Sequence, residues 1–180
     1  MQDNTKIVLL IGAPSTGKTS VLNHLNRKGF NCFDEISREV VQEARRNGYD
    51  HLFKDEPLLF SEKLLEGRVE QFLSAKKTNA EFVFIDRGLP DITAYLDMVN
   101  TSYPIDFEMA NQNYRYDFIF WFPVWRDIHI ADEERYENFE LSQKIESYLI
   151  NSYQNLKYDL IEVPKLNIES RVKFLLSYLK

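Results

Sequence analysis

The stretch Gly12-Ala13-Pro14-Ser15-Thr16-Gly17-Lys18-Thr19 follows the pattern G-x-x-x-x-G-K-[ST] and decides the fold. An apolar run, 7–11, precedes it, and a helical pattern, 20–25, follows it, so the loop is predicted to join a strand to a helix. Such loops bind nucleoside triphosphates because their glycines allow a tight turn in which backbone N–H groups converge on phosphate. The partly positive N-terminus of the following helix adds to that attraction.

Two polar residues of this loop have specific expected roles. Lys18 reaches the β- and γ-phosphate oxygens, and the hydroxyl of Thr19 is a ligand for Mg²⁺. The alternative is a helix-capping Thr19 beside a solvated Lys18, and the strand and helix around the loop argue against it. The predicted nucleotide contacts are Gly12, Ala13, Pro14, Ser15, Thr16, Gly17, Lys18, Thr19 and Ser20.

Length and composition narrow the class of protein. A chain of 180 residues is expected to form one domain, 1–180, with a sizeable core. The net charge of −6, with no basic stripe, makes nucleic acid an unfavourable partner. Cys32 is the only cysteine, which excludes disulfide scaffolds and cysteine-based zinc sites.

No apolar run approaches the roughly 20 residues that span a bilayer, and the start lacks a signal-peptide pattern. We therefore expect a cytoplasmic protein without membrane partners.

Short apolar runs alternate with helical patterns along the chain. The runs 7–11, 82–85, 118–122 and 160–163 are typical of parallel strands buried on both faces, and 30–33 is a weaker fifth candidate. Helical patterns occupy 57–76, 141–156 and 172–179. The alternation predicts an α/β fold of three layers, with a five-stranded, mostly parallel sheet and helices on both faces.

The residues after the run 82–85 separate the classes of P-loop protein. Asp86 is followed by Arg87 and Gly88, whereas motor ATPases place a glutamate beside this aspartate. The D-x-x-G motif of switch GTPases is absent because Leu89 is the third residue after Asp86. The segment 156–159 resembles the guanine-reading N-K-x-D motif only loosely, and it precedes the last strand instead of following it. A small-molecule kinase pattern remains.

Phosphoryl transfer requires cations, Mg²⁺ and a carboxylate around the transferring group. The predicted sheet edge supplies the arginines and the carboxylates, where ligands bind in open α/β sheets. Asp86 is expected to bind metal or to orient the acceptor, and its alternative role is a helix cap, which Asp91 also fits. Glu35 is either the acceptor's base or a structural ion-pair partner of Arg38. Arg87 contacts the acceptor or phosphate, or else pairs with nearby acids.

A charged segment follows the fourth apolar run. Arg126 and Arg135 bracket it, and in kinases such a segment is a lid whose arginines close over the phosphates. Arg126 is therefore a predicted nucleotide contact, and the predicted catalytic residues are Lys18, Asp86, Glu35, Arg87 and Arg135. The alternative is an ordinary solvated helix and loop. Nearby aromatic residues such as Trp125 fit either a base-stacking site or the core.

The motifs together resemble a known family. The phosphate loop, Asp34-Glu35-Ile36-Ser37-Arg38, Asp86-Arg87-Gly88 and Asp132-Glu133-Glu134-Arg135 look like those of the P-loop ATPases grouped with the ribosylnicotinamide-kinase domain of NadR and the TRPL-translocation-defect-like ATPases. The resemblance extends to 158–164 and 169–172. It implies a nucleotide-kinase-like fold that binds ATP and Mg²⁺. Pro14-Ser15 replaces the Glu-Ser typical of the NadR loop, so the acceptor stays open.

Two functions of different class agree with these residues. The first is a Mg²⁺-dependent kinase that transfers the ATP γ-phosphate to a hydroxyl of a nucleoside-like or other small molecule. The second is a regulatory ATPase or GTPase whose slow hydrolysis controls a protein partner. A kinase needs an acceptor pocket with a carboxylate, whereas a regulator needs an exposed apolar surface. Glu35, Asp86 and the arginine-bearing segment favour the kinase.

Overall fold

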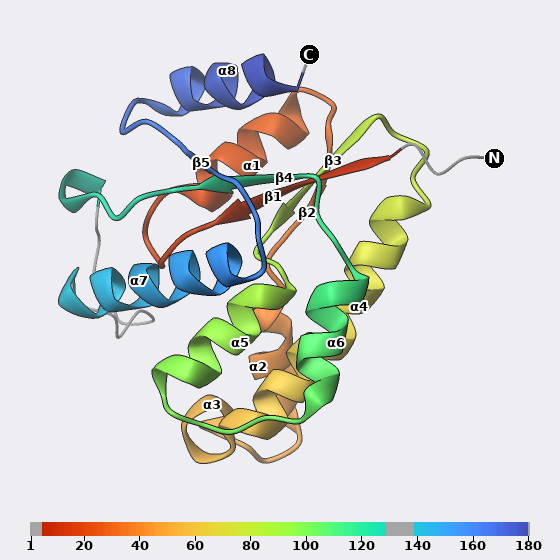
Figure 1. Cartoon of the computed structure of the whole chain (residues 1–180), viewed down its shortest axis with the longest axis vertical. Helices are drawn as coiled ribbons and strands as arrows, with labels where there is room; N and C mark the ends of the chain where they lie inside the picture. Colours follow the sequence, from red (N-terminus) through yellow and green to blue (C-terminus); the bar gives the residue numbers. More distant parts are fainter. Residues whose placement is uncertain (1–4, 129–138, 180) are drawn as a thin grey trace.

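Five parallel strands form the centre of the molecule (Figure 1). The structure, a computed structural model, describes residues 5–128 and 139–179. The sheet order is β2-β3-β1-β4-β5, and every neighbouring pair is parallel. The strands are β1 Lys6–Ile11, β2 Asn31–Phe33, β3 Phe82–Asp86, β4 Phe118–Trp121 and β5 Leu160–Glu162. All five predicted strands are confirmed, with ends that differ by one residue.

Helices cover both faces of the sheet, which confirms the predicted three layers. In Figure 1, α1 and α8 lie above the sheet, while α4, α5, α6 and α7 lie below it. The helices of the upper layer are α1 Lys18–Arg27 and α8 Ile168–Tyr178. Those below are α2 Ser37–Arg46, α3 Leu52–Asp55, α4 Pro57–Lys76, α5 Leu89–Met98, α6 Ile105–Asn113 and α7 Phe139–Asn155, and a short 3₁₀ helix, η1, spans Arg126–Ile128.

The central strand explains why both faces are covered. Side chains alternate along a strand, so Val8 and Leu10 point to the face of α1 and α8, and Leu9 points to the opposite face. All three are completely buried. A strand that is apolar on both sides is stable only between two layers, which is the reason for the continuous apolar runs in the sequence.

Local signals set several helix ends. Gly29 follows α1 with φ +89°, a left-handed conformation that suits glycine after a helix. Pro57 begins α4, and Asn167 caps α8 by accepting a hydrogen bond from the Ser170 N–H at 2.9 Å.

A second core lies away from the sheet, between helices α2 to α6. Phe60 and Leu64 of α4 pack there against Ile92 and Leu96 of α5. This helical layer stands beyond the carboxyl ends of β2 and β3 and forms one wall of the site described below. Among the described residues, no helix is long and apolar enough to cross a membrane.

Candidate nucleotide and acceptor site

The loop between β1 and α1 has the tight backbone that phosphate binding requires. Gly12 has φ +146° and Gly17 has φ +85°, and between them Ser15 has φ +61°, which is uncommon for a residue with a side chain. A Cβ atom at Gly12 would lie 2.5 Å from the backbone oxygen of Phe122. Both glycines are therefore needed for the path of the chain, and the loop fits closely against the end of β4.

Lys18 is buried within this loop and not solvated. Its Nζ donates to the carbonyl oxygens of Gly12 at 2.8 Å and Ala13 at 2.9 Å, and its side chain is only 5% exposed. Burial, and secondarily the charge of Arg87, lowers the pKa of Lys18 from 10.5 to about 8. The alternative of a surface lysine is wrong, and the ammonium group is held at the loop where phosphate would bind.

Asp86 and Thr19 meet where β3 and α1 come together. Thr19 Oγ1 donates to Asp86 Oδ2 at 3.3 Å, while Asp86 Oδ1 is buried with no hydrogen-bond partner. Burial raises the pKa of Asp86, although Lys18 and Arg87 act in the opposite direction. A hydroxyl beside a carboxylate with a spare oxygen fits Mg²⁺, which takes one or two protein oxygens and completes its shell with water and phosphate. The described residues hold no cluster of three or more His, Cys, Asp or Glu side chains that could bind a metal ion.

Glu35 is held by two arginines from different elements. Its Oε1 accepts from Arg68 Nη2 at 3.1 Å, and its Oε2 forms an ion pair with Nε of Arg87. Oε1 also accepts the backbone N–H of Ser37 at 3.0 Å, at the start of α2. Burial alone would raise the pKa of Glu35, but Arg68 and then Arg87 lower it below its usual 4.5. The suggested ion pair between Glu35 and Arg38 is wrong, because the carboxylate of Glu35 pairs with Arg68 and Arg87 instead.

The turn after β3 is fixed by Asp91, the buried first-turn acid of α5. Its Oδ2 accepts from the Gly88 N–H at 3.0 Å and from the hydroxyl of Tyr153 at 2.5 Å, and its Oδ1 pairs with Arg87 Nη1 at 3.4 Å. Arg87 itself has φ +69°, an unfavourable conformation for an arginine, so the surrounding contacts must hold it there. Asp91 thus supplies the helix cap, which leaves Asp86 available for other work.

One large cleft joins these groups. Its volume is about 1570 Å³, and it extends from the phosphate loop to the helical layer on one side and to the start of α8 on the other. The acceptor wall, as we name the surface of Glu35, Arg68, Arg87 and Asp91, lines the first side. The other side is lined by Trp125, Ile128, Leu166, Asn167, Ile168 and Arg171. From the predicted set, Pro14, Ser15, Thr16, Gly17, Lys18, Thr19, Ser20, Glu35, Asp86 and Arg87 line the same cleft.

Four predicted residues do not line the cleft in the described part of the chain. Gly12 and Ala13 are buried within the phosphate loop, and the other two are Arg126 and Arg135. Arg126 is exposed on η1, and its guanidinium stacks on the Phe139 ring with 4.3 Å to the centroid. It is not among the residues that line the cleft. Arg135 lies outside the described residues, as does most of the predicted lid. The roles of Arg126 and Arg135 stay predictions.

Sequence reasoning missed three groups at the site. Arg68 lies between Leu64 and Phe72 in the apolar stripe of α4, where an arginine at helical spacing was the available signal. Tyr153 of α7 gave no signal, since a tyrosine in an amphipathic helix ordinarily belongs to the core. Arg171 was noticed only as part of the family resemblance, and its contact with the loop spans 155 positions.

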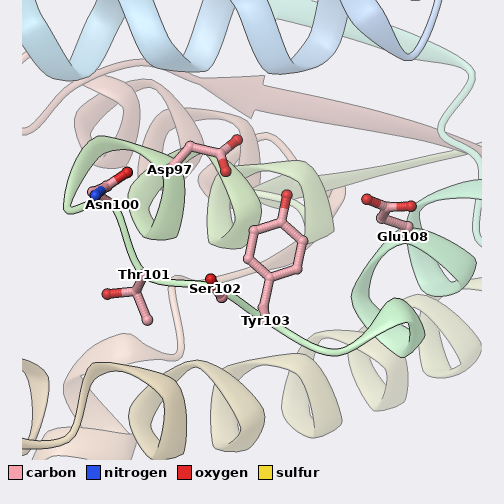
Figure 2. A pocket seen from close by; sticks show the side chains of 6 residues that line it. All are labelled: Asp97, Asn100, Thr101, Ser102, Tyr103 and Glu108. Carbon is pink, nitrogen blue, oxygen red and sulfur yellow. The ribbon is translucent and has the colours of Figure 1, made fainter.

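A second, smaller cavity lies away from the phosphate loop. It measures about 360 Å³ and lies between the end of α5 and the start of α6, where Tyr103 stands between Asp97 and Glu108 (Figure 2). Burial and the neighbouring Asp97 raise the pKa of Tyr103 to about 12. Its lining contains none of the residues that we predict to contact nucleotide or metal.

The fold and the phosphate loop define a P-loop protein with a nucleotide-kinase-like sheet. The chain belongs to the AAA domain family, whose sequence profile matches residues 7–171. This agrees with the predicted resemblance. No protein of curated function matches the sequence.

Solved structures with a similar fold include two kinases and the NadR protein. Deoxyadenosine kinase from M. mycoides, with dCMP and dCDP bound, superposes with a TM-score of 0.70 at 16% identity, over 96% of this chain and 98% of its own. NadR in complex with NAD and AMP-PNP gives 0.68 at 16% identity, over 98% of this chain and half of its own. Thymidylate kinase from Candida albicans gives 0.66 at 13% identity, over 98% and 91%. At these identities the likeness shows the fold.

Proposed function

We propose that the protein is a Mg²⁺-dependent kinase that transfers the γ-phosphate of ATP to a hydroxyl of a small, nucleoside-like acceptor. The cleft carries this proposal, because its volume of about 1570 Å³ exceeds the ~300–1,000 Å³ of a site for one drug-sized ligand. It therefore offers room for a nucleotide and an acceptor together. The phosphate loop lies between the two halves of the cleft, as transfer from one ligand to the other requires.

The nucleotide fits the half of the cleft between the phosphate loop and α8. Backbone N–H groups of the loop and the ammonium of Lys18 face the phosphates in this arrangement, and Trp125 with Leu166 and Ile168 supplies the apolar lining that a base prefers. Phosphate binding would draw the Lys18 ammonium from the carbonyl oxygens that now accept its hydrogen bonds. The charge of Lys18 then offsets that of the phosphates.

Thr19 and Asp86 are the residues that would hold Mg²⁺. The unpartnered Oδ1 of Asp86 supports this assignment, since a buried carboxylate oxygen without a donor is unfavourable unless a cation is bound. Bound Mg²⁺ neutralises charge on the phosphoryl oxygens during transfer. Asp86 is available for this role because Asp91 caps the neighbouring helix.

The acceptor wall would orient the attacking hydroxyl. In the reaction, a bond forms between the acceptor oxygen and Pγ, the bond from Pγ to the bridging oxygen of ADP breaks, and the hydroxyl proton leaves to a carboxylate or water. Because two arginines lower the pKa of Glu35, it is a weak base, and we assign it to orientation of the hydroxyl by hydrogen bonding. Arg87 is the cation placed to contact the transferring phosphoryl group.

A nucleoside-like acceptor is supported by the fold and by the size of the cleft. The similar structures include a deoxyadenosine kinase and a thymidylate kinase. Phe53, Phe60 and Tyr95 line the far part of the cleft and provide flat apolar surfaces on which a base can stack. The identity of the acceptor then depends on polar groups such as Gln42 and His51 in the same lining.

One observation favours the regulatory alternative. Ile105 and Met109, one turn apart on α6, are 63% and 50% exposed, and Val99 nearby in sequence is also exposed. A regulator of a partner protein would use such a surface. Substitution of Ile105 and Met109 by serine separates the two functions, because it leaves a kinase unchanged and abolishes partner binding by a regulator.

A thermal-shift screen of metabolites in the presence of Mg²⁺ and AMP-PNP tests the proposal. A ligand that binds the folded state raises the melting temperature, so acceptors are expected to add to the shift that AMP-PNP alone produces. Nucleosides and nucleoside monophosphates should head the list of active compounds. A matched screen with Glu35→Gln, which changes the group assigned to orient the acceptor hydroxyl, should reduce the acceptor shift and keep the AMP-PNP shift. No shift with AMP-PNP would contradict the proposal.

A further inference from the structure

An arginine of α8 lies against the phosphate loop from the layer opposite α4. Arg171 is only 5% exposed, and its Nη1 donates to the carbonyl oxygen of Thr16 at 3.1 Å. The fit is close, because a Cβ at Gly17 would lie 2.7 Å from the same Nη1. Gly17 is thus needed for the approach of Arg171 as well as for its own positive φ.

The charge of Arg171 has no acidic partner among the described residues. Its Nε is buried without a hydrogen-bond partner, and its guanidinium faces the rings of Trp125 and Phe122 at 5.8 and 6.0 Å. Burial lowers the pKa of Arg171, with no carboxylate acting against it. By contrast, Arg68 and Arg87 both pair with Glu35. A buried cation that lacks an anion is unfavourable, so the free protein carries a charge that a ligand can neutralise.

The contact with Thr16 also orients the loop. In a planar trans peptide the C=O and N–H groups have a fixed relative orientation, so the hydrogen bond that holds the Thr16 carbonyl also fixes the direction of the Gly17 N–H. That N–H is one of the donors that the phosphate loop offers to an anion. Arg171 itself lines the cleft beside the loop.

We propose that Arg171 is a positioning residue for the nucleotide phosphates: it fixes the Thr16–Gly17 peptide, and its buried charge is neutralised when the phosphates bind. This inference rests on the proposed function, because it assigns Arg171 to the nucleotide half of the cleft. Arg171 is therefore expected to contribute to the affinity for nucleotide and not to the stability of the free protein.

Arg171→Met separates this role from a structural one. The variant keeps an apolar stem between the two aromatic rings and removes the charge. We expect its melting temperature to equal or exceed that of the wild type, while its affinity for Mg²⁺–AMP-PNP falls at least about tenfold in calorimetric titration. Mg²⁺–tripolyphosphate, which lacks a base, should lose affinity by a similar factor. Lys173→Met removes one exposed charge from the same helix and should change neither quantity.

Arg171→Gln keeps the test decisive if the methionine variant does not fold, because its shorter side chain removes the charge and still places a polar amide beside the loop. The affinity of Arg171→Gln for Mg²⁺–AMP-PNP should also fall at least about tenfold. Wild-type affinity in either folded variant would overturn the inference and leave the proposed function standing. Weaker AMP-PNP binding with unchanged tripolyphosphate binding would also overturn it, because Arg171 would then act on the base. If the wild type bound neither probe, the proposed function would fail first.

Discussion

Thr19 Oγ1 lies 3.3 Å from Asp86 Oδ2, so the first turn of α1 and the carboxyl end of β3 share one hydrogen bond. The two residues are 67 positions apart, and β1 pairs directly with β3 to bring them together. The other carboxylate oxygen of Asp86 has no partner. This arrangement connects the phosphate loop to the transfer chemistry, because a metal ion held by both residues also contacts phosphate.

Asp86→Asn is expected to lower phosphoryl transfer by at least about a hundredfold with a smaller effect on ATP affinity. Folding should not suffer, since burial raises the pKa of Asp86 and a neutral amide removes that unfavourable charge. Steady-state rates and calorimetric affinities check both statements. Asp97→Asn, in the smaller cavity, is the matched control and should leave the rate unchanged. Unchanged turnover in Asp86→Asn would return this residue to a structural role.

Nucleotide affinity is expected to fall as pH rises above 8. Lys18 loses its proton near pH 8 in the free protein, whereas bound phosphate favours the charged form, so binding above pH 8 takes up a proton. The Kd for Mg²⁺–ADP should therefore be about tenfold higher at pH 9 than at pH 7. Calorimetry in buffers of different ionisation enthalpy measures the proton uptake. Lys18→Met should bind weakly at both pH values and show no uptake; a pH-independent wild type would contradict the prediction.

Glu35→Gln is expected to destabilise the protein by about 3 kcal/mol or more, because it leaves Arg68 and Arg87 buried with one charge partner fewer. The folded pKa of Glu35 is lower than its unfolded value, so its contribution is present above pH 4.5 and is lost as pH falls through the folded pKa. Urea unfolding across that range measures both effects. In Glu39→Gln, an exposed change on α2, stability should stay within about 0.5 kcal/mol of wild type.

Gly17→Ala and Gly29→Ala form a matched pair. Their φ angles are +85° and +89°, so both substitutions carry the same backbone penalty of about 1 kcal/mol or slightly more. A Cβ at Gly17 would meet Arg171, whereas a Cβ at Gly29 has open space around it. Only Gly17→Ala should reduce AMP-PNP affinity, by tenfold or more. Equal affinities in a filter-binding or calorimetric assay would show that the close contact with α8 is unimportant.

Local patterns were enough to predict the sheet and the phosphate loop. The run 7–11 and the motif after it specify a strand, a turn and a helix within about 20 residues, and no distant contact is needed to recognise them. The parallel orientation of the strands follows from the alternation with helices.

The partners of Glu35 could not be predicted in the same way. A pairing with Arg38 is natural in sequence, but the carboxylate accepts the N–H of Ser37 and faces Arg68, 33 positions away on α4. That contact depends on how α4 is rotated against β2 and α5, which is a property of the packed core. The contact of Arg171 with Thr16 is similar, because it depends on α8 returning to the sheet beside α1.

The most direct test of the central claim is transfer of label from γ-³²P-ATP to a panel of nucleosides, nucleoside monophosphates and other small alcohols in the presence of Mg²⁺. We expect at least one acceptor to become labelled and to accelerate the formation of ADP, and we expect Lys18→Met to abolish the label. Slow release of labelled inorganic phosphate at a rate that no acceptor changes would contradict the kinase and favour the regulatory alternative.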